Sequence, residues 1–156
     1  MPKRTRWLSA DEQRAWRAYL ESSRLLYAAI EGQLQRDAEM PHTYYEILVR
    51  LSEAPNRELR MTQLADACMS SKSRVSHAVA RLEERGWVRR AEDATDRRGQ
   101  VAKLTDKGFA ALEKIAPGHV EAVRSSLFDA LSPAQVKQLR TISEAVVNRL
   151  DSPPSD

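Results

Sequence analysis

Apolar side chains recur every three or four positions through most of the chain, which predicts a largely helical protein. The first such stretch follows the pair Ser9 and Glu12, which is typical of a capping box, and ends near Met40–Pro41. A second, short helix is expected from a capping box at Thr43–Glu46 to about Pro55. Each helix carries a continuous apolar face and therefore needs a surface to cover it.

Shorter elements are predicted in the middle of the chain. Glu58–Met61 can form a brief strand, and Thr62 opens a short helix that ends in a turn at Met69–Ser71. The next helix is expected from Ser71 to Arg85, and Gly86 follows it where a left-handed terminator belongs. Its inward positions are spaced three and four apart: Val75, Ala78, Val79 and Leu82.

Two alternating segments, Trp87–Ala91 and Val101–Leu104, predict strands on either side of the polar stretch Glu92–Gln100. Such a hairpin with an extended tip is a wing. Thr105 or Asp106 then caps a long helix, in which Pro117–Gly118 predicts a kink or two abutting helices. Ser132–Gln135, with proline at the first helical position, predicts the start of a last helix.

These elements predict a mainly α, α+β fold: a winged helix-turn-helix with a small β-hairpin wing, flanked by terminal helices that form a dimerisation region. The expected parts are an N-terminal dimerisation helix (1–40), a DNA-binding domain (41–105), C-terminal dimerisation helices (106–151) and a disordered tail (152–156). Intertwining with a second copy would cover the apolar terminal helices. The alternative is that these helices fold back on their own core.

The second helix of a helix-turn-helix enters the major groove of DNA. Arg74 can bond to guanine through two N–H groups, and His77 can donate to guanine or adenine acceptors. The short hydroxyls near the helix start suit close approach to phosphates. The predicted DNA-binding residues of this helix are those off its apolar face: Ser71, Lys72, Ser73, Arg74, His77 and Arg81.

Charge supports this prediction. The whole chain has a net charge of +3, whereas residues 70–105 hold nine basic and five acidic residues, a net charge of +4. The basic excess is therefore concentrated where the motif lies. The alternative, a merely solvated basic face, does not explain the turn, the glycine and the hairpin together.

The loop from Asp93 to Gly99 carries the most specific local signal. An arginine at a wing tip, here Arg97 or Arg98, can enter a narrow minor groove, where the negative potential is enhanced. Asp96 could pair with Arg98 and hold it in position. The alternative is an ordinary surface loop with fortuitous charges.

The run from Arg81 through Gly108, RLEERGWVRRAEDATDRRGQVAKLTDKG, resembles the wing signature of MarR-type regulators. The resemblance implies a triangular homodimer, with the terminal helices at its interface, that binds a pseudo-palindromic operator, usually as a repressor. It implies that Arg98 is the minor-groove arginine and Asp96 its partner. It also places Ser73, Arg74 and His77 where the family reads bases.

The chain departs from this family pattern at two positions. Trp87 takes a place more often held by Leu or Tyr, and Pro117 breaks a helix that is continuous in many members. The family resemblance also implies that a small aromatic or phenolic effector can release the DNA. Amphipathic rings that could line such a site are Trp16, Tyr19, Tyr27, His42, Tyr44 and Tyr45. The alternative is that these rings belong to the core.

No other chemistry is indicated by the sequence. The single cysteine, Cys68, is expected to be a buried apolar side chain rather than a redox sensor, and the histidines lack metal-ligand spacing. No cofactor or metal is expected, and an enzyme or a DNA-independent helical interaction module is the alternative function. The basic start MPKRTRW precedes no apolar stretch, and no run reaches the roughly 18 residues of a membrane span. We therefore expect a cytoplasmic protein.

Overall fold

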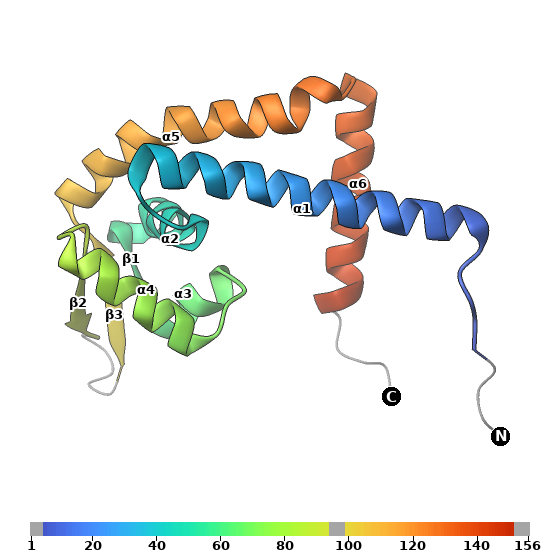
Figure 1. The fold of residues 1–156 in the computed structure, drawn as a ribbon. Helices are drawn as coiled ribbons and strands as arrows, with labels where there is room; N and C mark the ends of the chain where they lie inside the picture. Colours follow the sequence, from blue (N-terminus) through green and yellow to red (C-terminus); the bar gives the residue numbers. More distant parts are fainter. Residues whose placement is uncertain (1–4, 94–98, 152–156) are drawn as a thin grey trace. The chain divides into compact units, whose positions relative to one another are not determined.

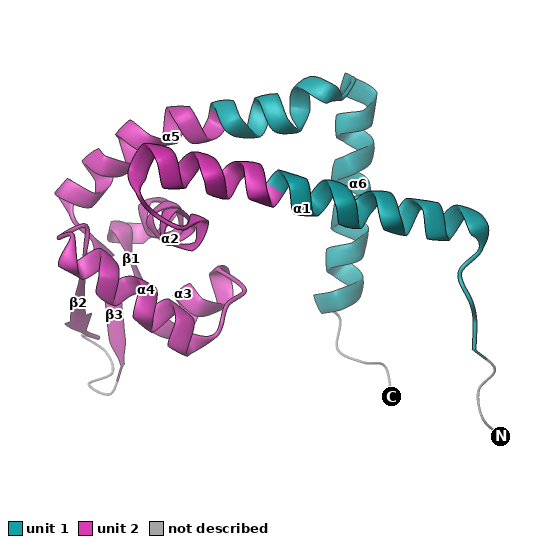
Figure 2. Cartoon of the chain, in the orientation of Figure 1, with its two compact units in different colours: residues 1–26, 121–156 teal, residues 27–120 magenta. Residues whose placement is uncertain are grey.

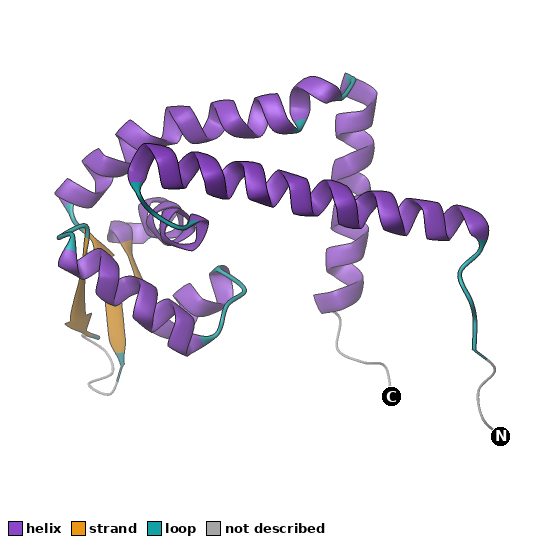
Figure 3. Ribbon diagram, viewed as in Figure 1, coloured by secondary structure: helices purple, strands orange, loops and turns teal. Residues whose placement is uncertain are grey.

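The computed structural model describes residues 5–93 and 99–151. Helices and a three-stranded antiparallel sheet make up the described chain, which confirms the predicted fold class (Figures 1 and 3). None of these helices is long and apolar enough to cross a membrane. The elements are α1 (Ala10–Ala38), α2 (His42–Glu53), η1 (Pro55–Arg57), β1 (Glu58–Arg60), α3 (Met61–Ala67), α4 (Lys72–Glu84), β2 (Val88–Glu92), β3 (Gln100–Leu104), α5 (Asp106–Ser126), η2 (Phe128–Ala130) and α6 (Pro133–Asp151).

The chain divides into two compact units (Figure 2). One unit holds residues 27–120: the end of α1, the middle elements and the first part of α5. The other holds residues 1–26 and 121–156. The helix-turn-helix and the strands therefore lie in a single unit.

The core of the 27–120 unit is built from the apolar faces that the sequence pattern predicts. The inward positions of α4, namely Val75, Ala78, Val79 and Leu82, are all buried, as expected. They belong to a core that also receives side chains from α1, α2 and α3: Leu34, Ile47, Leu48, Leu51 and Leu64. Burial of such side chains is the main favourable contribution to this unit's stability.

Two of the three predicted capping boxes are present. Ser9 N donates to Glu12 Oε2 (2.7 Å), and Ser132 N donates to Gln135 Oε1 (2.8 Å). The predicted box at Thr43–Glu46 is wrong, because the cap of α2 is Pro41, two residues before Thr43, and the helix begins at His42. The carboxylate of Glu31 in α1 accepts from the His42 N–H instead (2.9 Å). A distant residue thus replaces the local cap.

The sheet has the order β1-β3-β2. The predicted hairpin is present as β2 and β3, with Val88 opposite Leu104. The brief predicted strand, β1, pairs with the edge of β3 that faces away from β2, and Glu58 lies opposite Lys103. Their side chains form an ion pair of 3.1 Å. The short β1 therefore ties the segment before α3 to the wing.

Helix α5 continues through Pro117 as one element, so the predicted alternative of two abutting helices is wrong. Proline costs the helix one backbone hydrogen bond, but packing can offset this loss. Gly118 lies against α1, where an added Cβ would be 3.2 Å from Asp37 Oδ2 and 3.4 Å from Gln33 Nε2. Two side chains of α1 therefore reach the backbone of α5 next to the proline.

The apolar stripe of α6 is not covered within the described chain. No residue of this helix is buried, and Ile142 and Leu150 are 62% and 78% exposed. Val146 is also exposed. A contiguous apolar surface of this kind is typical of an interaction site.

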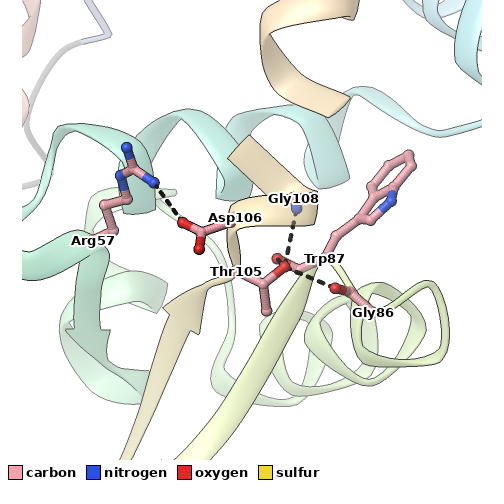
Figure 4. A network of polar contacts seen from close by, with 6 residues as sticks. All are labelled: Arg57, Gly86, Trp87, Thr105, Asp106 and Gly108. Atoms are coloured by element: carbon pink, nitrogen blue, oxygen red, sulfur yellow. Dashed lines mark hydrogen bonds and ion pairs between the residues drawn. The ribbon is translucent and has the colours of Figure 1, made fainter. Parts of the chain in front are cut away.

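One network joins α4, β2 and α5 (Figure 4). The hydroxyl of Thr105 donates to the carbonyl of Gly86 (2.7 Å) and lies 3.1 Å from that of Trp87. It also accepts from the Gly108 N–H at 3.0 Å, which caps α5. Gly86 itself has a φ of +70°, the left-handed conformation that glycine adopts readily.

Gly108 permits this junction because a Cβ there would lie 2.1 Å from the backbone oxygen of Trp87. We expect Gly108→Ala to lower the free energy of unfolding by about 1–3 kcal/mol, since the backbone must shift. Urea denaturation followed by circular dichroism, at fixed protein concentration, measures the change. Gly32→Ala is the matched control, because its Cβ would meet only the movable guanidinium of Arg36. The control should be neutral or stabilising, and a Gly108→Ala protein as stable as the parent would contradict the packing argument.

Candidate nucleic-acid interface

Helix α4 begins at a well-formed cap. Ser71 Oγ accepts from the Arg74 N–H (3.3 Å) and lies 3.3 Å from the hydroxyl of Ser73. Met69, with a φ of +44°, makes the sharp turn between α3 and α4. The positive end of the α4 dipole and its hydroxyl-bearing first turn therefore face solvent together, which suits an anionic partner.

All the predicted α4 contact residues are exposed: Ser71, Lys72, Ser73, Arg74, His77 and Arg81. Their exposure follows from the helical period, because Val75, Val79 and Leu82 occupy the opposite, buried face. The structure thus brings these six residues together on one open helix face.

The basic side chains of this region differ in their partners. Arg81 donates to Glu84 (2.9 Å), an interaction that raises the pKa of Arg81 further. Arg90 is held by Glu83 (2.8 Å) and is half-buried. Lys72 and Arg74 form no ion pair with any described residue. The N-terminal end of α4 therefore presents two cations that no described carboxylate engages.

The base of the wing is fixed by Asp93. Its backbone N–H donates to the Gly99 carbonyl (3.0 Å), and its carboxylate, only 7% exposed, pairs with Arg60 Nε at 2.5 Å. The predicted wing-tip residues Asp96, Arg97 and Arg98 lie outside the described residues. Sequence reasoning missed the role of Arg60, because no local pattern links β1 to a loop more than thirty residues later.

A groove of about 370 Å³ runs beside the exposed face of α4 that carries the predicted contact residues. The start of α2 supplies Thr43 and Tyr44 to one wall, and α4 supplies Ser73, Arg74 and His77 to the other. Tyr44, predicted as an effector contact, therefore lies next to the predicted base-reading residues. Thr43 was not predicted, and only its place in the fold points to it.

The other predicted effector residues fall into two groups. Tyr45 and His42 lie together in the 27–120 unit, with ring centroids 6.4 Å apart, and Tyr27 is 6.4 Å from His42. The ring of His119, from α5, lies against that of Tyr45 in a tilted contact, with centroids 4.1 Å apart. Trp16 and Tyr19 stack on one another in the other unit (6.1 Å).

Burial governs the chemistry of this cluster. Desolvation, with His42 as a second cause, lowers the pKa of His119, and desolvation raises the pKa of Tyr45. Both groups therefore stay uncharged at neutral pH. His119 Nδ1 and the buried Gln33 Oε1 make no hydrogen bond within the described residues. The described residues hold no group of His, Cys, Asp or Glu side chains that could bind a metal ion.

The fold and the predicted contact face can be compared with known proteins. The sequence profile of the MarR family matches residues 39–99. The transcriptional repressor MprA of Escherichia coli is 31% identical over 114 residues. That match covers 73% of this chain but 64% of MprA, which is less than two thirds of the relative's length.

Two solved structures match over nearly the whole chain. Sco3205, a MarR family regulator from Streptomyces coelicolor crystallised in complex with DNA, is 51% identical, with a TM-score of 0.93. The match covers 99% of this chain and 96% of Sco3205. AbsC, a MarR family regulator from the same organism, is 42% identical, with a TM-score of 0.88. That match covers 94% of this chain and 98% of AbsC.

The buried thiol of Cys68 gives a testable prediction. Burial, together with the nearby Glu46, raises its pKa from 9.0 to about 11. The reactive thiolate is therefore about a hundredfold rarer at pH 8 than in the unfolded chain. We expect iodoacetamide to modify the native protein at least that much more slowly than the urea-unfolded protein, as measured by mass spectrometry. Equal rates would contradict the expected role as a buried apolar side chain.

Proposed function

The chain belongs to the MarR family of transcriptional regulators, and we propose that it binds specific duplex DNA through α4 and the wing. The family relatives described above are regulators, not enzymes. We further propose that the chain acts as a repressor, since MprA is one. Because such a protein works on chromosomal DNA, its expected location is the cytoplasm.

The exposed face of α4 carries this proposal. Its first turn presents hydroxyls and backbone N–H groups that can bond to phosphates, and Lys72 adds a charge for the same contact. Arg74 and His77, one turn further, are the side chains proposed to reach base edges in the major groove. Arg81 is expected to contribute less, since Glu84 already engages it.

The wing is proposed to enter the adjacent minor groove. Support comes from its anchored base, where Asp93 pairs with Arg60, and from the sequence signature of the tip. In this proposal Arg98 enters the groove, Asp96 orients it, and Arg97 contacts the backbone.

We propose that the protein is a homodimer that binds a pseudo-palindromic operator. The open apolar stripe of α6, with Ile142 and Leu150 exposed, supports a partner surface on the terminal helices. We propose the same division of the chain that the sequence predicts. It has dimerisation segments at 1–40 and 106–151, a DNA-binding domain at 41–105 and a tail at 152–156.

An aromatic or phenolic effector is proposed to release the DNA. The cluster of Tyr45, His42, Tyr27 and His119 supports it, because flat rings there lie beside a buried imidazole nitrogen that has no hydrogen-bond partner among the described residues. Trp16 and Tyr19, and Tyr44 in the groove beside α4, stay as further proposed contacts.

Selection of bound duplexes from a random pool tests the proposed function. We expect an inverted repeat whose half-sites lie about one helical turn apart, bound with an affinity that falls steeply with salt. An enriched half-site without its repeat would contradict the dimer. No enrichment of any duplex would instead favour a DNA-independent helical interaction module.

Arg74 and Lys72 should have distinguishable roles on the selected operator. We expect Arg74→Ala to weaken binding by about 1–3 kcal/mol and to relax the preference at one base pair, because a direct base contact is lost. Lys72→Ala should weaken all sequences alike, because it contacts phosphate. Fluorescence anisotropy on the operator and on single-base variants measures both effects. Arg50→Ala on α2, at an exposed residue outside the proposed DNA contacts and dimerisation segments, is the charge-matched control. Unchanged binding by Arg74→Ala would refute the assignment.

Arg98 is expected to recognise a narrow minor groove rather than to form a hydrogen bond with one base. We expect Arg98→Ala to weaken operator binding by about 1–3 kcal/mol, most strongly where the flanking minor groove is narrow and A·T-rich. Binding to operators with A·T-rich or G·C-rich flanks, measured with parent and variant, tests this. A loss of affinity that is the same for both flanks would argue against minor-groove insertion.

A further inference from the structure

The groove of about 370 Å³ beside α4 has a second wall, which belongs to the start of α2. Helices α2 and α4 pack against each other in the 27–120 unit (Figure 1). Thr43 and Tyr44, with the capping Pro41, form the α2 wall. Both Thr43 and Tyr44 are partly exposed, although most of the apolar side chains that follow them in α2 are buried. These two residues therefore lie at the surface beside the predicted contact residues of α4.

The hydrogen-bonding groups at the start of α2 are only partly used by the fold. Glu31 accepts from the His42 N–H (2.9 Å), and the Tyr44 N–H donates to the Pro41 carbonyl (3.0 Å). Pro41 provides no side-chain acceptor for this turn. The N–H and hydroxyl of Thr43 and the phenol of Tyr44 form no hydrogen bond with any described residue. These donors are therefore available to an acceptor from outside the chain.

The surroundings of the groove are positive. Its α4 wall holds Arg74, and no carboxylate of the described chain lines it. The pKa of Arg81, further along α4, is raised mainly by Glu84 and to a smaller extent by Tyr44, so the phenol lies near this guanidinium as well. A phosphate in the groove would therefore meet hydroxyl donors on the α2 side and a cation on the α4 side.

The dimensions of duplex DNA bring a phosphate to this groove. An α-helix with its side chains is about 10–12 Å across, and the major groove is about 12 Å wide. A helix that enters the major groove therefore fills it, and an element beside that helix meets the sugar–phosphate backbone at the groove edge. With Arg74 and His77 directed toward the bases, the start of α2 is such an element.

We propose that the groove between α2 and α4 holds one phosphate of the operator backbone, with the Thr43 hydroxyl and the Tyr44 phenol donating to its oxygens. This occupant follows from the unpaired donors beside a cation and from the continuity of the groove with the exposed face of α4. The inference rests on the proposed binding of DNA through α4. A phosphate held between two helices limits how far α4 can slide or turn in the major groove. Thr43 and Tyr44 are therefore positioning residues rather than base readers.

Two hydroxyl deletions test these residues in the full-length protein on the selected operator. Tyr44→Phe combined with Thr43→Val removes both hydroxyls at nearly constant volume. We expect binding at least about tenfold weaker by fluorescence anisotropy, equally for the operator and its single-base variants. Because a neutral donor releases no counterion, the salt dependence should stay parental, whereas Lys72→Ala should make it less steep. Ser52→Ala, a hydroxyl deletion at the other end of α2, is the control and should bind like the parent.

Methylphosphonate substitution, applied to each phosphate of one half-site in turn, identifies the contact. We expect one position that weakens binding by the parent but has a smaller effect on the double variant, because both changes remove the same interaction. Thermal unfolding checks that the variants are folded, and Tyr44→Phe alone, which removes a single oxygen, replaces the double variant if that protein is unfolded.

Three results would overturn the proposal: parental binding by the double variant, a loss that depends on the base sequence, or equal effects of every methylphosphonate on parent and variant. Arg74→Ala on the same duplex separates this inference from the proposed function. If Arg74→Ala weakens binding and the double variant does not, only the phosphate contact is wrong. If neither variant weakens binding, the proposed contact of α4 with DNA is wrong as well.

Discussion

The hydrogen bonds of the Thr105 hydroxyl are the interaction on which the arrangement of the 27–120 unit depends. With one oxygen this side chain reaches the carbonyl of Gly86 after α4 and caps the first turn of α5 at Gly108. The end of the helix proposed to read DNA, the start of the wing strand and the start of the long helix are thereby fixed to one point (Figure 4). Gly86 and Gly108 are required on either side, the first by its left-handed φ of +70° and the second by its closeness to the Trp87 backbone. One side chain therefore links the start of α5 to the end of α4.

Much of this arrangement could be predicted, because it rests on short-range patterns. The burial of Val75, Val79 and Leu82 follows from helical spacing, and the end of α4 follows from Gly86. The cap at Ser71 needs only the residues beside it. Such features are decided within a few residues, where the backbone's unsatisfied N–H groups and the side-chain period leave few alternatives. The exposed face of α4, with the predicted contact residues, is the side of the helix opposite its buried face.

The remaining features depend on residues brought together by tertiary packing. Glu31 of α1 caps α2 in place of Thr43, and Arg60 of β1 holds Asp93 at the wing. His119, far along the chain, completes the ring cluster at Tyr45. No spacing rule links such residues, because their proximity follows only once several apolar faces have packed together. Gly118, which follows Pro117 in the continuous α5, likewise lies beside side chains of α1, those of Gln33 and Asp37.

Charge placement divides α4 into two functional halves. The basic residues from 70 to 105 differ in the partners that the fold provides for them, a difference that a count of charges does not include. Arg81 and Arg90 are paired with glutamates, and Arg85 bonds to carbonyls of α1. The pair of Glu83 with Arg90 and the bonds of Arg85 join the end of α4 to β2 and α1, whereas Arg81 pairs within α4 itself. Lys72 and Arg74, at the N-terminal end, have no such partner among the described residues, and there the helix dipole also favours an anion.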